Sequence, residues 1–148
     1  MLFRSLARVE AARPPVTVAL EWKGGLRFAG NTPGAELLVD GDSAAGPSPV
    51  QLLAFALAGC MAADLVHVLT RSRVPPRAVH VTFTGESAED HPRRFLRAAL
   101  HFAVSGDVPA EKIERALALS REKYCSVWHS LRPDIEFQTS FERVNGGA

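Results

Sequence analysis

The chain contains two cysteines, and each lies in a different kind of segment. Cys60 ends the uncharged, alanine-rich string GPSPVQLLAFALAGC, whereas Cys125 follows charged residues in the string SREKYCSV. The thiolate form of cysteine attacks electrophiles and binds metals, so two such residues could form one reactive pair. A free cysteine can also be an inert, buried hydrophobe. The residues around each cysteine indicate which of these two roles, reactive or packing, is favoured.

The residues around Cys60 favour a packing role when they are taken alone. On a helix, Cys60 shares its face with Asp64 and His67, one and two turns further on, and otherwise with apolar side chains. Apolar surroundings raise the pKa of a thiol, and reactivity then needs a nearby cation. Three mixed ligands on one helix face, without a fourth, are not a typical zinc site. We expect no metal here, and a water-exposed His67 near the helix end.

Cys125 has a stronger local case for reactivity. We expect it at the N-terminus of a short helix, where the helix dipole and free N–H groups favour a thiolate. Lys123 precedes it by two residues and His129 follows it by four. The alternative is a partly buried cysteine that closes a helix corner. The local sequence leaves both interpretations open.

Size and charge exclude several classes of partner. The 148 residues are enough for one domain with an ordinary core, and we expect a single domain over 1–148. The net charge of +1 predicts neither a nucleic-acid nor a membrane partner. Residues 1–15 have no apolar signal-peptide core, so we interpret them as a weakly structured lead-in. These features predict a cytoplasmic protein, in which a disulfide would be transient.

Residues 49–66 are apolar over nearly the length of a membrane span. Gln51, Gly59 and Asp64 interrupt this run, so we predict a buried helix of a soluble protein. Ser48, Pro49 and Gln51 form a capping box with proline at the first helical position. The helix should continue to about Arg71.

Alternating apolar and polar residues predict strands on both sides of this helix. The expected strands are 16–23, 26–28, 36–39, 79–84, 97–104 and 134–142, with further helices starting near Pro109 and Cys125. Ile113, Ala116, Leu117 and Tyr124 have the spacing of one buried helix face. The order β-β-β-α-β-β-α-α-β is an α+β fold, with antiparallel sheets around a long buried helix. Because that helix is apolar on every side until His67, we expect a second subunit to cover it.

The strings around Cys60 and Cys125, with the strand ending HFAVSG, resemble the OsmC/Ohr family of thiol-dependent peroxidases. The resemblance runs from about Val16 and is strongest to the YhfA-like branch. It implies an OsmC-like fold and an intertwined homodimer with two sites at the subunit interface. It also implies that Cys60 attacks the peroxide and that Cys125 then closes a disulfide. An external thiol reductant would be needed, and no bound cofactor.

The chain departs from the family pattern beside the first cysteine. Val50 occupies the position where the peroxidase branches have a glutamate, and Gln51 follows it. The family also uses an arginine from the N-terminal strands, for which Arg27 is the nearest candidate. Taken alone, Gln51 is more simply a cap partner and Arg27 a solvated strand-end charge. These departures predict weak peroxide reduction.

Two functions are therefore in competition. The first is an OsmC-like peroxidase that reduces organic or other small hydroperoxides through Cys60 and Cys125, in defence against oxidative stress. The second is a non-enzymatic protein of the same fold that binds a small apolar ligand at the dimer interface. Val50 favours the second function, and the pairing of the cysteines favours the first.

Overall fold

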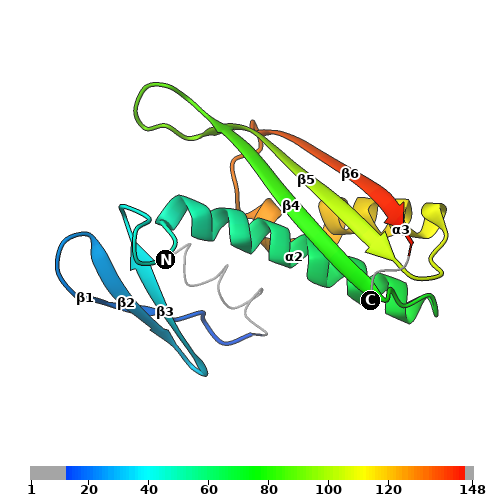
Figure 1. Ribbon diagram of the computed structural model, residues 1–148, viewed down its shortest axis with the longest axis horizontal. Helices are drawn as coiled ribbons and strands as arrows, with labels where there is room; N and C mark the ends of the chain where they lie inside the picture. The colour runs from blue at the N-terminus through cyan, green and yellow to red at the C-terminus, as the bar shows by residue number, and fades with distance from the viewer. Residues whose placement is uncertain (1–12, 146–148) are drawn as a thin grey trace, which may run out of the picture. The chain divides into compact units, whose positions relative to one another are not determined.

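The computed structural model describes residues 13–145, so the expected lead-in at residues 1–15 lies almost entirely outside the described residues. The described residues divide into two compact units, one ending at Val50 and the other beginning at Gln51, so the boundary falls in the first turn of the long helix. The element order is the predicted one, with a π-helical turn added between the last two helices. The chain is therefore of the α+β class (Figure 1).

The first unit is a three-stranded antiparallel sheet in the order β1-β2-β3. Its strands are β1 (Ala19–Trp22), β2 (Arg27–Thr32) and β3 (Ala35–Asp40). The tight turn between β1 and β2 uses Gly24 and Gly25, whose φ angles of 101° and 55° favour glycine. The Trp22 indole N–H donates to the Gly25 carbonyl at 2.9 Å and fixes this turn.

The loop after β3 is organised by one carboxylate. Asp40 is buried, and its side-chain oxygens accept hydrogen bonds from the backbone N–H groups of Asp42 and Ala45, each at 2.9 Å. The bonds from Ala45 and then Asp42 lower the pKa of Asp40. The helix α2 (Pro49–Arg71) follows this loop and has the predicted bounds.

The second unit contains the other sheet and the remaining helices. Its elements are β4 (Ala78–Ser87), β5 (Phe95–Ser105), α3 (Ala110–Leu119), the π-helical turn η1 (Ser120–Tyr124), α4 (Ser126–His129) and β6 (Glu136–Val144). β4 and β5 are antiparallel as predicted, but β6 pairs with β5 in parallel. The expectation of wholly antiparallel sheets is wrong here because α3, η1 and α4 form a crossover connection, which brings the chain back in the same direction.

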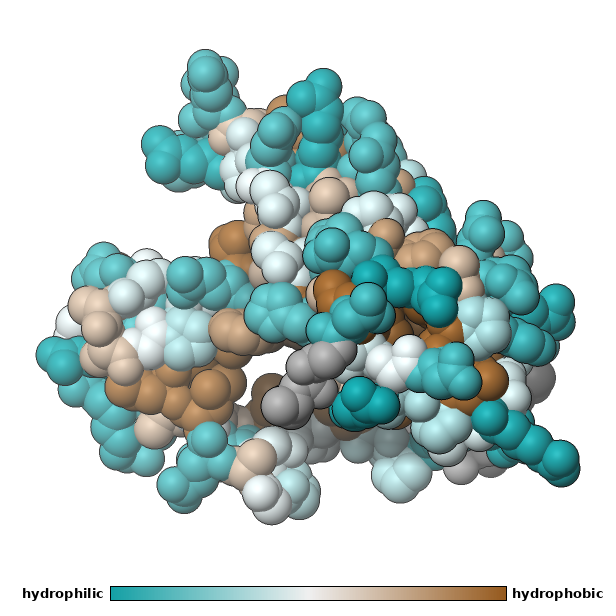
Figure 2. Space-filling model, turned by 45° about the vertical axis from the view of Figure 1, so that its right-hand side comes forward, coloured by the Kyte–Doolittle hydropathy of each residue, from teal (hydrophilic) through white to brown (hydrophobic). Residues whose placement is uncertain are grey.

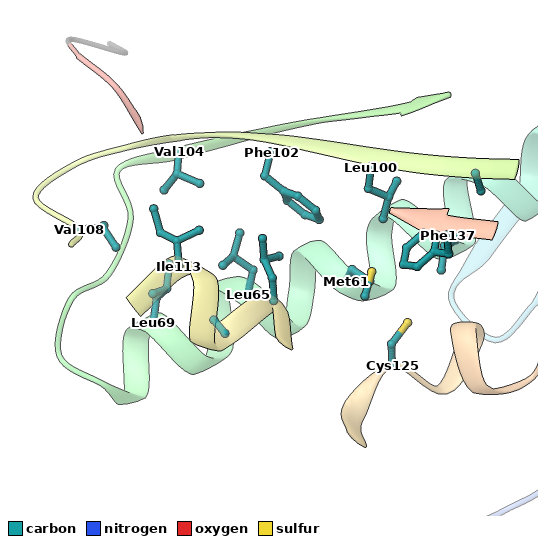
Figure 3. Close-up of a cluster of buried hydrophobic side chains, with 14 residues drawn as sticks. Met61, Leu65, Leu69, Leu100, Phe102, Val104, Val108, Ile113, Cys125 and Phe137 are labelled. Atoms are coloured by element: carbon teal, nitrogen blue, oxygen red, sulfur yellow. The ribbon is translucent and has the colours of Figure 1, made fainter. Parts of the chain in front are cut away.

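The core of this unit lies between the sheet and the helices (Figure 3). On α2 every fourth residue is buried: Leu57, Met61, Leu65 and Leu69. On β5 alternate residues are buried: Ala98, Leu100, Phe102 and Val104. Ile113, Ala116 and Leu117 of α3 are buried as their spacing predicted, but Tyr124 is 48% exposed. Tyr124 departs from the pattern because η1 interrupts the period of the α-helix.

The apolar residues of α2 are not all covered. Phe55 is 68% exposed, Val50 52% and Val66 40%. Figure 2 shows apolar surface among the polar residues of one face of the molecule. By length and composition alone, α2 could cross a membrane, but the core helix of a soluble protein passes the same test. The predicted all-round burial is therefore not complete within one chain.

Candidate redox site

Cys60 lies near the middle of α2, next to the fully buried Met61. Its side chain is half-buried and packs against the core cluster. Asp64, one turn further along α2, is also half-buried. The helical spacing of these two residues places a thiol and a carboxylate on one face of the helix.

Cys125 is positioned by the change of helix type after α3. In the π-helical turn, the N–H of Cys125 donates to the Ser120 carbonyl at 2.8 Å. Cys125 then becomes the N-cap of α4, and its sulfur accepts a hydrogen bond from the Trp128 N–H at 3.3 Å. Its side chain is fully buried at the edge of the core cluster (Figure 3). The predicted position at a helix N-terminus is confirmed.

The two segments bring three reactive groups together. The Sγ atoms of Cys60 and Cys125 and a carboxylate oxygen of Asp64 lie within 4.8 Å of one another. The Ser120 hydroxyl donates to Asp64 Oδ2 at 2.7 Å, and the Ser126 hydroxyl oxygen lies 3.9 Å from Cys60 Sγ. Both cysteines are free thiols. An S–S bond is about 2.05 Å long, so a disulfide would need only a local shift of these side chains.

Burial dominates the electrostatics of Cys125. The pKa of the Cys125 thiol is raised to about 11, chiefly by removal from water and to a smaller extent by the neighbouring Cys60 and Asp64. The Trp128 N–H bond opposes them and lowers the pKa, as expected at a helix N-terminus. The expectation that this terminus favours a thiolate is therefore wrong in its net direction. Cys125 is a protonated thiol at neutral pH.

The other predicted residues have separate positions. Arg27 is the first residue of β2 in the first unit, and Gln51 and Val50 are exposed in the first turn of α2. The supporting roles of Arg27 and Gln51 stay predictions. His67 is exposed near the end of α2, as expected.

Sequence reasoning missed the parts played by Asp64 and Ser120. The helical spacing of Asp64 from Cys60 was visible, but no local pattern connected Asp64 with Cys125. Ser120 had no signal, because its position depends on the π-helical turn. Single π-helical turns within α-helices are frequently found at functional sites.

The same group has the donor types of a zinc site. It contains two sulfurs and one carboxylate oxygen, and His67 is not part of it. A closed zinc site uses four ligands, and this group provides three. We therefore interpret the group of Cys60, Asp64 and Cys125 as a redox site and call it the thiol–carboxylate site.

The fold and the two cysteines place this chain in a known class. The chain belongs to the family of OsmC-like proteins, whose family model matches residues 40–140. It is 38% identical over 128 residues to Protein YhfA of Escherichia coli strain K12, a match that covers 84% of this chain and 96% of that protein. The resemblance inferred from the sequence is confirmed.

Solved structures have the same fold. A hypothetical protein from Aquifex aeolicus VF5 is 25% identical and superimposes with a TM-score of 0.84, over 90% of this chain and 99% of that one. An organic hydroperoxide resistance protein, OsmC from Legionella pneumophila, is 20% identical with a TM-score of 0.66, over 88% and 98% of the two chains. At that identity, the likeness to the Legionella protein establishes the fold alone.

Proposed function

We propose that this protein is a thiol-dependent peroxidase that reduces organic or other small hydroperoxides through Cys60 and Cys125. The observation that supports this most is the approach of both sulfurs and the Asp64 carboxylate to within 4.8 Å, from two separate segments. Membership of the OsmC-like family adds support, as does the name of the Legionella protein. A role in packing alone would not require the two sulfur atoms to lie close together.

The unequal burial of the cysteines suggests their order of action. Half-buried Cys60 is the more accessible thiol, so its thiolate attacks one peroxide oxygen. The O–O bond breaks, the other oxygen leaves as an alcohol after taking a proton, and Cys60 becomes a sulfenic acid. Cys125 sulfur then attacks Cys60 sulfur, the S–O bond breaks, and hydroxide leaves as water. Two molecules of an external thiol reductant regenerate both cysteines.

The proposed setting follows from the same chemistry. The protein would act in the reducing cytoplasm during oxidative stress, as a homodimer and without a bound cofactor. A disulfide formed there is transient, because cytosolic thiols reduce it. This is the behaviour that a catalytic pair requires.

Peroxide titration of three proteins tests the proposal. Treated with one equivalent of tert-butyl hydroperoxide, the wild type should lose both thiols within one chain. Cys125→Ser should stop at a sulfenate on Cys60 that a trapping reagent labels, and Cys60→Ser should leave Cys125 unreacted. Intact mass and peptide mapping identify each product. A first sulfenate on Cys125 would reverse the two roles.

The rival function is binding of a small apolar ligand. An apolar crevice lies between α2, β4, β5 and the segment from α4 to β6, lined by residues such as Leu53, Phe83 and Trp128. Its volume of about 10 Å³ holds no more than one water, whereas ligand sites measure hundreds of cubic ångströms. The apolar lining of the crevice suits an apolar ligand, but its volume is too small to hold one. Survival of both thiols in excess peroxide would put the rival function ahead.

A further inference from the structure

The redox cycle proposed above contains a step that Cys125 cannot perform alone. To close the disulfide, Cys125 has to attack as a thiolate or lose its proton during the attack. Burial raises the pKa of this thiol to about 11, so at pH 7 only about one molecule in ten thousand carries the thiolate. A base beside Cys125 would remove this obstacle.

We propose that Asp64 is the general base for closing the Cys60–Cys125 disulfide, an inference that rests on the proposed function. Its carboxylate takes the proton from Cys125 as the Cys125 sulfur attacks the Cys60 sulfenic acid. The S–S bond forms, the S–O bond breaks, and the departing hydroxide takes the proton from Asp64 to leave as water. Asp64 ends the step as a carboxylate, so atoms and charge balance.

The geometry favours this role for Asp64. A carboxylate oxygen lies within 4.8 Å of both sulfurs, a separation that one bridging water or a small rotation would close to hydrogen-bond contact. The Ser120 hydroxyl holds Oδ2 at 2.7 Å. Ser120 is fully buried, and its carbonyl also accepts the N–H of Cys125 at 2.8 Å. One residue of the π-helical turn thus connects the proposed base to the thiol that it would deprotonate.

The charge of Asp64 alone would have the opposite effect. A nearby negative charge disfavours the thiolate, and Asp64 contributes to the raised pKa of Cys125. If Asp64 were only an electrostatic neighbour, removing its charge would speed disulfide closure. If it is the base, removing the carboxylate slows closure. The sign of the change distinguishes the two roles.

The decisive experiment separates the two steps in full-length protein. Quenched-flow samples of reduced protein mixed with tert-butyl hydroperoxide are analysed by mass for trapped Cys60 sulfenate and for disulfide. In Asp64→Asn, sulfenate formation should not be slowed, while closure should slow about 100-fold, the lower end for loss of a general base. Closure as fast as in the wild type, or faster, would overturn the inference.

Matched variants serve as controls that separate loss of the base from an effect on folding. Asp64→Glu keeps a carboxylate and should restore much of the closure rate, whereas Ser120→Ala should slow closure only in part. Glu122→Gln removes an exposed carboxylate from the same π-helical turn and should leave both steps unchanged. A loss of closure in Asp64→Asn that Asp64→Glu does not restore would indicate a structural role instead.

The pH profile supplies a readout that a structural role would not change. Among the described residues, the titratable groups acting on Cys125 are Cys60 and Asp64 from α2. The other titratable groups close to these residues in sequence are all exposed: Glu122, Lys123, Tyr124 and His129 beside Cys125, and His67 beside Asp64. Measurements from pH 7.5 to 9.5 lie above the usual histidine pKa of about 6.5. In this range the rate of disulfide closure in Asp64→Asn should rise about tenfold per pH unit, because the fraction of Cys125 present as thiolate does so. The closure rate of the wild type should rise much less.

A failure of this inference would look different from a failure of the proposed function. If Asp64→Asn closes normally after a Cys60 sulfenate has formed, the peroxidase proposal stands and only the role of Asp64 is wrong. If the wild type forms no sulfenate at all, the peroxidase proposal itself fails, and the inference fails with it.

Discussion

At Cys125, burial and a helix N-terminus act on the same thiol in opposite directions, and burial is the larger effect. A buried, protonated thiol is suited to attack a sulfenic acid beside it and is protected from oxidants in solution. Cys60 has the complementary environment, since it is half-buried and lies beside the Ser126 hydroxyl. Unequal exposure of two thiols that lie close together is what a two-step oxidation requires.

The raised pKa of Cys125 gives a first prediction. In the reduced, folded protein, alkylation of Cys125 by iodoacetamide should rise about tenfold per pH unit from pH 8 towards 11, without a plateau near 9. Mass mapping of each cysteine measures this. In denaturant, the alkylation rate of Cys125 should reach a plateau just above its ordinary pKa of 9.0. A plateau near pH 9 in the folded state would contradict the effect of burial.

The same shift has a consequence for stability. The folded state binds the Cys125 proton more tightly than the unfolded chain, so this contribution is fully present below pH 9 and is lost as pH rises to 11. The free energy of unfolding of the wild type, measured by denaturant melts, should therefore decrease over this pH range more than that of Cys125→Ala. Parallel pH dependence in the two proteins would show that the thiol does not titrate as described.

Val50 gives a third prediction at the scale of one residue. It has no group that could orient an arginine, and by the family resemblance it occupies the position where the peroxidase branches have a glutamate. If Arg27 or another arginine lies within reach of the new carboxylate, we expect Val50→Glu to speed the formation of the Cys60 sulfenate by about tenfold. Val50→Gln, which has the same length without the charge, is the control. A wild type that already reduces hydroperoxides rapidly would contradict this account of Val50.

The elements that hold the site could largely be predicted from the sequence. The capping residues predicted the start of α2, and period-two patterns located four of the strands, because both signals are local. The parallel pairing of β6 could not be predicted, because alternation along a strand does not reveal the direction of its neighbour. The π-helical turn could not be predicted either, and it determines that Ser120 faces α2. The pairing of Cys60 with Cys125 came from the family resemblance rather than from any local pattern.

The packing of β4 on β5 allows a prediction for one element. A Cβ atom at Gly85 would lie 2.5 Å from a ring atom of Phe95 and 2.7 Å from one of Phe83. Gly85→Ala should therefore lower the free energy of unfolding by about 1–3 kcal/mol, as overpacking does. Denaturant melts measure the change. Adding Phe95→Leu, which removes one of the two rings, should reduce the penalty, and a penalty equal in both backgrounds would contradict the steric cause.

At the scale of the whole molecule, both units leave apolar side chains exposed. Trp22 and Leu20 of β1 are 64% and 60% exposed, and Phe55 and Val66 on α2 are 68% and 40% exposed. Large apolar side chains left exposed on an element such as α2 are typical of an interface with another protein. Homo-oligomers with twofold symmetry use the same patch on both subunits, so a second copy of this chain is the simplest partner.

We therefore expect a dimer that α2 holds together. Light scattering across a dilution series should give twice the mass of one chain down to low micromolar concentration. Phe55→Glu places a charge on the exposed face of α2 and should shift the equilibrium to monomer by at least tenfold in the dissociation constant, because an unpaired charge in an interface is costly. Leu96→Glu is the matched control, since Leu96 is 41% exposed on β5. A wild type that is a stable monomer would contradict the prediction. If instead both variants dissociated equally, the interface would not be specific to α2.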